Sequence, residues 1–185
     1  MCIRDRPFAA LGGAQADQAV ICTAPSKTFN LAGLGTSNII IPNAEHRARF
    51  EQALQTSGLF GVNPFGIVAL EAAYNYGEDW LARVMDYVVE NYRFLEAYLD
   101  EYLPQITAVR PEGTYLVWLD CRSLGLDKEA LERLMLYEAR IFFSVGYHFG
   151  IEGEGFERIN IACPRSILVE ALERIKAAVD HLTSA

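Results

Sequence analysis

Residues 19–34 read AVICTAPSKTFNLAGL. The first six are small or apolar and include the β-branched Val20, Ile21 and Thr23, which is typical of a short strand covered on both faces. A proline and a serine then end the strand, and Lys27 stands in the turn beyond it. In α/β proteins, ligands bind in the crevice beyond the carboxyl ends of such strands. This segment therefore predicts an α/β fold with Lys27 at a ligand-binding edge.

The rest of the chain continues to alternate strands and helices. The expected elements are a strand at 37–41, helices at 45–59, 63–74 and 78–103, strands at 107–110 and 115–119, a helix at 127–140, strands at 141–144 and 158–162, and a closing helix at 166–182. The aromatic residues Trp80, Tyr87 and Tyr98 of the long helix stand at helical spacing, which favours a place in the core.

Pro104 follows the long helix and ends it. We therefore expect residues 7–104 to form part of a large domain together with its connecting helix, and residues 105–185 to form a small α+β domain. Residues 1–6, Met-Cys-Ile-Arg-Asp-Arg, fit neither domain, and we interpret them as a non-native leader or a scar of sequence assembly.

Lys27 is the first candidate site residue. A lysine held partly out of water at a strand end can attack an aldehyde as a nucleophile. The alternative is an ordinary lysine that reaches solvent from the end of its strand, and the residue alone favours that alternative. Thr23 and Ser26 flank the lysine, and their hydroxyls can donate to a phosphate or merely tie down the turn.

Arg158 is the second candidate. In the strand that begins with it, Ile159 and Ile161 alternate to one face, so Arg158 and Asn160 share the other face and need not enter the core. A guanidinium in that position can bind a carboxylate through two hydrogen bonds. The alternative is a surface arginine that pairs with Glu157 or another acid.

Four stretches carry a family resemblance. They read TAPSKTFNLAGL at 23–34, TSNIIIPN at 36–43, PEGTYLVWLD at 111–120 and RINIACPRS at 158–166. In this order they resemble the fold-type I pyridoxal-phosphate enzymes of the class I/II aminotransferase superfamily, and most of all the MalY/PatB branch of carbon–sulfur β-lyases. Members of this family are about twice as long, so we interpret the sequence as the C-terminal half of such a protein.

The resemblance implies a cofactor, a substrate and roles for the site residues. Lys27 would bind pyridoxal 5'-phosphate covalently and later take the substrate's α-proton, Thr23 and Ser26 would contact the cofactor, and Arg158 would bind the α-carboxylate of a small amino-acid substrate. It also implies a homodimer at full length. Where many aminotransferases of this fold carry a phosphate-binding arginine, eight positions after the lysine, this chain has Gly35.

The sequence leaves three functions open. The first is a β-lyase that cleaves cystathionine or related cysteine conjugates to a thiol, pyruvate and ammonia. The second is a class I/II aminotransferase that uses the same residues. The third is an inactive truncated chain, or a module that associates through exposed apolar surface.

Charge and cysteine content exclude other classes. The formal net charge of −8 argues against nucleic-acid and anionic-membrane partners. The four cysteines lack the paired short spacing of a zinc site or a disulfide framework, so we expect no metal and a reducing, cytoplasmic setting. No apolar run approaches the roughly 20 residues that a membrane span needs, which predicts a soluble protein.

Overall fold

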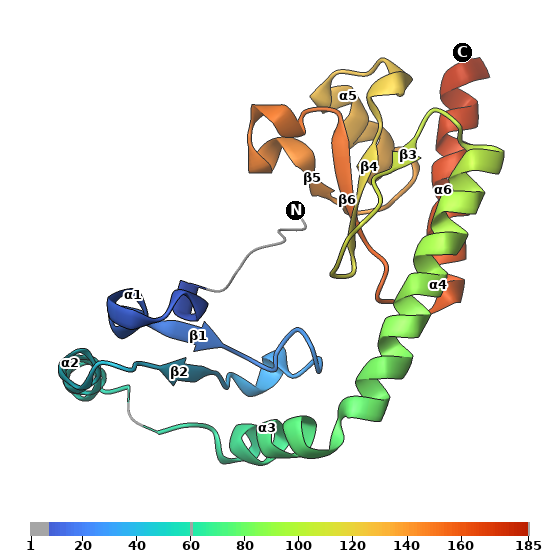
Figure 1. Ribbon diagram of the computed structural model, residues 1–185. Helices are drawn as coiled ribbons and strands as arrows, with labels where there is room; N and C mark the ends of the chain where they lie inside the picture. Colours follow the sequence, from blue (N-terminus) through green and yellow to red (C-terminus); the bar gives the residue numbers. More distant parts are fainter. Residues whose placement is uncertain (1–7, 60, 185) are drawn as a thin grey trace. The chain divides into compact units, whose positions relative to one another are not determined.

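The chain divides into two compact units, which are described separately. The computed structural model describes residues 8–59 and 61–184, so the leader expected at 1–6 lies outside the described residues (Figure 1). The first unit ends at Val84 and the second begins at Met85, inside the long helix α4 (Glu78–Tyr102). The two compact units thus divide inside α4, whose C-terminal part belongs to the second unit. The domain boundary near Pro104 stays a prediction.

The first unit carries the lysine segment between two short strands. Its elements are η1 (Phe8–Leu11), α1 (Gly13–Asp17), β1 (Ile21–Thr23), η2 (Ala32–Leu34), β2 (Asn38–Ile40), α2 (Ala44–Thr56), α3 (Pro64–Tyr76) and the start of α4. β1 and β2 are antiparallel, with Ile21 opposite Ile40 and Thr23 opposite Asn38. The predicted strands are confirmed. Val20 and Cys22 are exposed, so the described residues do not supply the cover that we expect on both faces of β1.

The two helices predicted after β2 begin at asparagine caps. The Asn43 side chain accepts a hydrogen bond from the His46 amide at the start of α2. At the start of α3, the Asn63 side chain accepts one from the Phe65 amide, and Pro64 occupies the first turn, where no amide hydrogen is needed. Each cap satisfies a backbone N–H that the helix itself leaves without a partner, which fixes where the helix begins.

The second unit contains the C-terminal part of α4 and a four-stranded antiparallel sheet. The elements after α4 are β3 (Thr107–Ala108), β4 (Leu116–Asp120), η3 (Arg122–Leu124), α5 (Lys128–Arg133), the π-helical η4 (Leu134–Glu138), β5 (Ser144–Val145), η5 (Gly146–Phe149), η6 (Ile151–Gly153), β6 (Phe156–Asn160) and α6 (Arg165–Ser184). The strand order is β3-β4-β6-β5. This is the small α+β arrangement that the sequence predicts.

The strand expected at 141–144 is mostly wrong. The chain leaves η4 through Arg140, whose φ of 56° is left-handed, and the Ile141 amide donates to the Met135 carbonyl at 2.8 Å. That bond closes the end of the helix and takes up an amide that a sheet would need. Residues 141–143 therefore form a connection in which Phe142 is 89% exposed, and pairing starts only at Ser144.

The core of the second unit lies between one face of the sheet and the helices α4 and α6, which run side by side (Figure 1). From the sheet and the residue after it come Val117, Leu119, Ile159 and Ile161, and from the helices Val88, Leu95, Leu99, Leu168, Leu172, Ile175 and Val179. Apolar area removed from water contributes about 25 cal/mol per Å². This core fixes which face of β4 and β6 is left for a site.

A buried asparagine ties α4 to the segment before α6. The Asn91 Nδ2 donates to the carbonyls of Ile161 at 2.8 Å and Cys163 at 2.9 Å, and its Oδ1 accepts from the Arg165 Nε at 2.7 Å. Arg165 also stacks on Phe94, with 4.5 Å between its Cζ and the ring centre. The second arginine of the 158–166 motif is therefore structural.

The aromatic residues of α4 are more exposed than the sequence predicts. The buried stripe of the helix consists of Val88, Asn91, Leu95 and Leu99. Trp80 and Tyr87 lie off this stripe and are exposed, while Tyr98 is half-buried. The prediction of a core position is therefore wrong for Trp80 and Tyr87, because helical spacing alone does not say which stripe faces the sheet.

Candidate functional site

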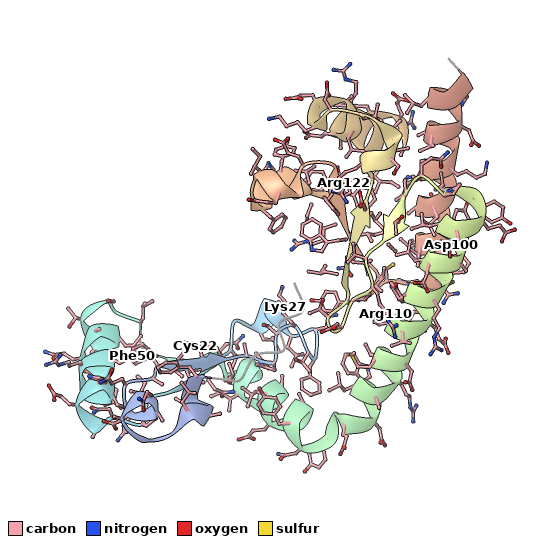
Figure 2. The ribbon with its side chains drawn as sticks, turned by 45° about the horizontal axis from the view of Figure 1, so that its top comes forward. Cys22, Lys27, Phe50, Asp100, Arg110 and Arg122 are labelled. Atoms are coloured by element: carbon pink, nitrogen blue, oxygen red, sulfur yellow. The ribbon has the colours of Figure 1, made fainter. Side chains whose placement is uncertain are left out.

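Lys27 lies on a single helical turn between β1 and β2 (Figure 2). The Phe29 amide donates to the Pro25 carbonyl at 2.9 Å, and the Leu31 amide donates to the Ser26 carbonyl at 3.1 Å. Asn30 has a φ of 55°, so it supplies the left-handed residue that ends such a turn. Asparagine is one of the few residues that adopt this conformation readily. The turn thus fixes the backbone on which Lys27 stands, and the lysine side chain is exposed.

Phe29 anchors this turn to the junction of α3 and α4. Its ring lies 5.9 Å from the Tyr74 ring and 6.1 Å from the Trp80 ring, measured between centroids. Gly77 stands between the two helices, where a Cβ would come within 2.4 Å of the Ala73 carbonyl oxygen and within 2.7 Å of the Phe29 ring. A larger residue at 77 would push the ring away, so the glycine allows the anchor that holds the lysine turn.

Thr23 and Ser26 precede Lys27 in the chain, and their contact with a cofactor stays a prediction. The Thr23 Oγ1 accepts from the Asn38 Nδ2 at 3.4 Å, which leaves its own hydroxyl hydrogen free to donate. Ser26 is half-buried, and Thr23 is exposed. Gly35 has a φ of 58° and caps η2, a conformation that glycine adopts at no steric cost.

Arg158 lies in the middle of β6, on the face of the sheet away from the core. Ile159 is buried and Arg158 is half-buried, so the predicted alternation is confirmed. Its neighbours in the sheet are Trp118 on β4 and Ser144 on β5. The Arg158 Nη2 donates to the Ser144 Oγ at 3.2 Å. The site residues that sequence reasoning missed, Trp118 and Ser144, can be found only from the strand register.

The guanidinium of Arg158 lies against two aromatic rings and has no acid partner among the described residues. Its Cζ is 4.5 Å from the Phe149 ring centre and 5.8 Å from that of Trp118. Its Nε is buried without an acceptor in the described part of the chain. The alternative of an ion pair with Glu157 is wrong, because successive strand residues point to opposite faces. Arg158 is therefore a cation that no carboxylate of the described chain neutralises.

Glu157 is a buried acid behind the same strand. Only 2% of the residue is exposed, and its Oε2 has no hydrogen-bond partner in the described part of the chain. Burial, and after it the nearby Glu132 carboxylate, raise the pKa of Glu157 to about 7. Glu132 itself accepts from the Tyr147 hydroxyl at 2.7 Å. Sequence reasoning did not single out Glu157 as a buried acid, although its place two residues before Ile159 puts it on the core face of the strand.

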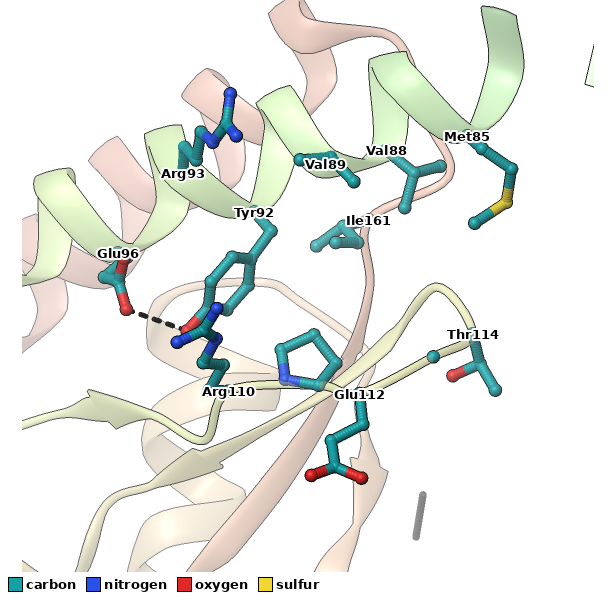
Figure 3. A pocket seen from close by; sticks show the side chains of 12 residues that line it. Met85, Val88, Val89, Tyr92, Arg93, Glu96, Arg110, Glu112, Thr114 and Ile161 are labelled. Atoms are coloured by element: carbon teal, nitrogen blue, oxygen red, sulfur yellow. Dashed lines mark hydrogen bonds between the residues drawn. The ribbon is translucent and has the colours of Figure 1, made fainter. Parts of the chain in front are cut away.

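A separate pocket of about 440 Å³ opens between α4 and the hairpin that joins β3 to β4 (Figure 3). Its floor is apolar, and its polar side chains include Tyr92, Glu96 and Arg110. The Tyr92 hydroxyl donates to the Glu96 Oε1 at 2.8 Å, and burial together with this bond raises the pKa of Tyr92 to about 12. Neither Lys27 nor Arg158 lines the pocket. We therefore assign it no part in the candidate site.

The candidate residues fall into two sets. Thr23, Ser26 and Lys27 belong to the first unit, and Arg158 belongs to the second. Within 8–59 and 61–184, no three side chains of histidine, cysteine, aspartate or glutamate gather as a metal site requires. No helix of that part combines the length and apolar content needed to cross a membrane.

Comparison with known proteins assigns the family. The model of the aminotransferase class I and II family matches residues 4–175. The chain belongs to this family. It is 43% identical to cystathionine beta-lyase PatB of Bacillus subtilis over 94% of its length. It is 32% identical to protein MalY of Escherichia coli over 90% of its length. The resemblance drawn from the four motifs is confirmed.

A solved structure supports the fold. Cystalysin from Treponema denticola, whose crystal structure contains pyridoxal 5'-phosphate, matches 95% of this chain with a TM-score of 0.88 and 40% identity. The predicted α/β fold class of the fold-type I group is confirmed. The chain spans about half the length of these family members, namely 45% of PatB, 43% of MalY and 44% of cystalysin.

Proposed function

We propose that this chain is the C-terminal part of a pyridoxal-phosphate-dependent carbon–sulfur β-lyase. The reaction would cleave cystathionine or a related cysteine conjugate to a thiol, pyruvate and ammonia. The observation that carries the proposal is Lys27 on its closed turn, within a chain that is 43% identical to a cystathionine beta-lyase. The bound cofactor of cystalysin supports the same chemistry.

The lysine turn fits a covalently bound aldehyde cofactor. The Lys27 amine is exposed and forms no ion pair in the described part of the chain, so it is available to bond. The Thr23 and Ser26 hydroxyls would donate to the phosphate group. When bound, pyridoxal phosphate stores the electron pair that is left on the substrate when its α-proton leaves.

Each site residue would then have its own role. Lys27 would hold the cofactor through its Nζ, and the same amine, once free, would accept the α-proton of the substrate. Arg158 binds the α-carboxylate in its guanidinium fork, which fixes the orientation of the α-carbon. No described acid competes for that fork. These two roles would serve the amine and the carboxylate that every α-amino acid carries, and would leave recognition of the substrate side chain to other residues.

An aminotransferase is the second candidate, since the family model includes such enzymes. Lys27 would serve both reactions, because both begin with removal of the α-proton. The two differ in where the proton returns and in whether the β-substituent leaves. The names of PatB and its relatives favour the lyase.

We further propose a cytoplasmic homodimer at full length. Large apolar side chains of α3 are exposed in the described chain, among them Phe65, Val68 and Tyr76. Such a surface needs cover from another part of the protein or from a second subunit. Cys22, Cys121 and Cys163 are free, which agrees with a reducing compartment.

The first test is visible absorbance of the full-length protein with pyridoxal phosphate. We expect a cofactor band that Lys27→Ala abolishes and that Lys128→Ala, a control at another exposed lysine, leaves unchanged. Borohydride reduction followed by mass spectrometry should place the cofactor on Lys27. A band that survives Lys27→Ala would overturn the assignment. Release of pyruvate from cystathionine without an added keto acid would support the lyase, and a requirement for a keto acid would support the aminotransferase.

A further inference from the structure

Arg158 is held by an aromatic clamp. We propose that Phe149 and Trp118 are positioning residues, which hold the guanidinium in the orientation that receives a substrate α-carboxylate. This inference rests on the proposed function of Arg158 and extends it to two residues that would not themselves touch the substrate. The substrate class is an α-amino acid with a free carboxylate.

The register of the sheet places Trp118, the first of the two aromatic residues, beside Arg158. Trp118 on β4 is paired with Arg158, and Ser144 on β5 is paired with it from the other side. These three side chains form one row across the open face of the sheet, because paired residues point the same way. The Ser144 Oγ accepts a hydrogen bond from the Arg158 Nη2 at 3.2 Å. This row therefore fixes one edge of the guanidinium.

Phe149 supplies the second wall. Its ring centre is 4.5 Å from the Arg158 Cζ, and the ring meets the Trp118 ring nearly edge-on, with centroids 5.2 Å apart and planes at 88°. Edge-to-face packing of this kind holds both rings in place. A cation over an aromatic face is attracted by the ring quadrupole, and the attraction grows as water is excluded. The two rings therefore fix the guanidinium without neutralising it.

The segment that carries Phe149 is itself fixed. Gly146, at the start of η5, lies so close to Gly153 that a Cβ would come within 2.1 Å of the Gly153 carbonyl oxygen. The next residue, Tyr147, donates its hydroxyl to Glu132 at 2.7 Å. These two contacts hold η5 against η6 and α5. Phe149 is 54% exposed, so its ring serves the clamp more than the core.

A carboxylate in place of the two aromatic rings would also hold Arg158. It would, however, compete with the substrate carboxylate for the N–H donors of the guanidinium. Aromatic rings have no such acceptors, so the guanidinium keeps its donors for a carboxylate. No carboxylate among the described residues pairs with the guanidinium, and the side chain that does accept from it, Ser144, is a neutral hydroxyl. The clamp thus combines a fixed orientation with an unneutralised charge.

The test compares Phe149→Leu with Phe149→Tyr in the full-length protein loaded with cofactor. We expect Phe149→Leu to weaken binding of an α-methyl amino acid, which keeps the carboxylate and lacks the α-proton, by about tenfold in Kd. Phe149→Tyr keeps the aromatic face and should restore binding. The same amine without its carboxylate should bind equally to wild type and both variants, because the clamp acts only through Arg158.

Two controls separate the outcomes. Phe142→Leu removes another exposed phenylalanine and should change nothing. Arg158→Gln should abolish the preference for the carboxylate ligand, and a preference that persists would overturn the proposed role of Arg158. If Arg158→Gln abolishes it while Phe149→Leu has no effect, the clamp proposal alone fails. Equal weakening of both ligands by Phe149→Leu would also overturn it, since that indicates a general structural loss.

Discussion

Glu157 is a carboxyl group on the core face of a strand whose other face carries Arg158. Its position follows from the two-residue period of β6, which places residue 157 on the same side as Ile159. Burial disfavours the charged form, and Glu132 adds like-charge repulsion. The result is an acid that holds its proton close to neutral pH and loses it only at a cost to the folded state.

The sign of this cost gives a prediction about stability and pH. The pKa of Glu157 rises from 4.5 to about 7 on folding, so the folded protein binds the proton more tightly than the unfolded chain does. Stability should therefore fall as pH rises from about 4.5 to about 7, by about 3 kcal/mol in full. Glu157→Gln removes this dependence. Urea midpoints of the full-length protein at pH 5 and pH 8 should converge in the variant.

Wild type and Glu157→Gln should differ more at pH 8 than at pH 5, with the variant gaining relative stability at the higher pH. A constant difference across this range would show that Glu157 titrates as an ordinary exposed acid. Glu129→Gln, at an exposed glutamate of α5, is the matched control and should leave the pH dependence unchanged.

The sequence predicts single residues well where a local period applies. The alternation of β6 places Arg158 on the open face, and the lysine turn is recognised from its own segment. The partners of Arg158 lie beyond such reasoning. Trp118 contacts Arg158 because of the strand register, and Phe149 because of the position of η5. Neither the register nor the position of η5 can be predicted from a local sequence pattern.

At the scale of elements, α3 packs on the segment that follows the lysine turn. Gly66 in the first turn of α3 is buried, and a Cβ there would lie 1.8 Å from the Thr36 Oγ1. The Asn63 Nδ2 also donates to the Leu34 carbonyl at 3.2 Å. The helix thus contacts the last residue of η2 and the Thr36 side chain directly, which only a glycine permits at this position.

Gly66→Ala should therefore destabilise the protein, although alanine is the better helix former by about 1 kcal/mol. The overpacked contact with Thr36 is expected to cost roughly 1–3 kcal/mol and to lower the thermal midpoint of the full-length protein. Gly33→Ala is the control, because that glycine has open space around its Cβ position and no left-handed φ. A Gly66→Ala variant as stable as Gly33→Ala would contradict the packing.

The order of elements is foreseen by the sequence, whereas irregular backbone is not. The helices α2, α3, α4 and α6 follow from apolar spacing and their end signals. The π-helical η4 and the left-handed Arg140 shorten the predicted strand at 141–144. These features depend on how the end of a helix satisfies its own carbonyls, which residue preferences describe poorly.

For the molecule as a whole, the two units differ sharply in their cores. Of the buried hydrophobic residues in the described chain, only Ala19 and Ile41 precede Val84, and all the others belong to the second unit. In the first unit, by contrast, Phe65 is 76% exposed and β1 pairs only with β2 among the described residues. A two-stranded sheet with little buried apolar surface is marginally stable in water.

This contrast predicts that the two parts fold differently when separated. Residues 77–185, which keep α4 whole, should fold alone with fixed side-chain packing, because the sheet, α4 and α6 bury a continuous core. Residues 7–84 should stay unfolded or associate, since their apolar side chains lack cover. Dispersed amide signals in an NMR spectrum of residues 77–185, lost in a Leu119→Asp control that places a charge in the core, would bear this out. Collapsed signals from residues 77–185 would contradict it, because the small domain would then need contacts that the described core does not contain.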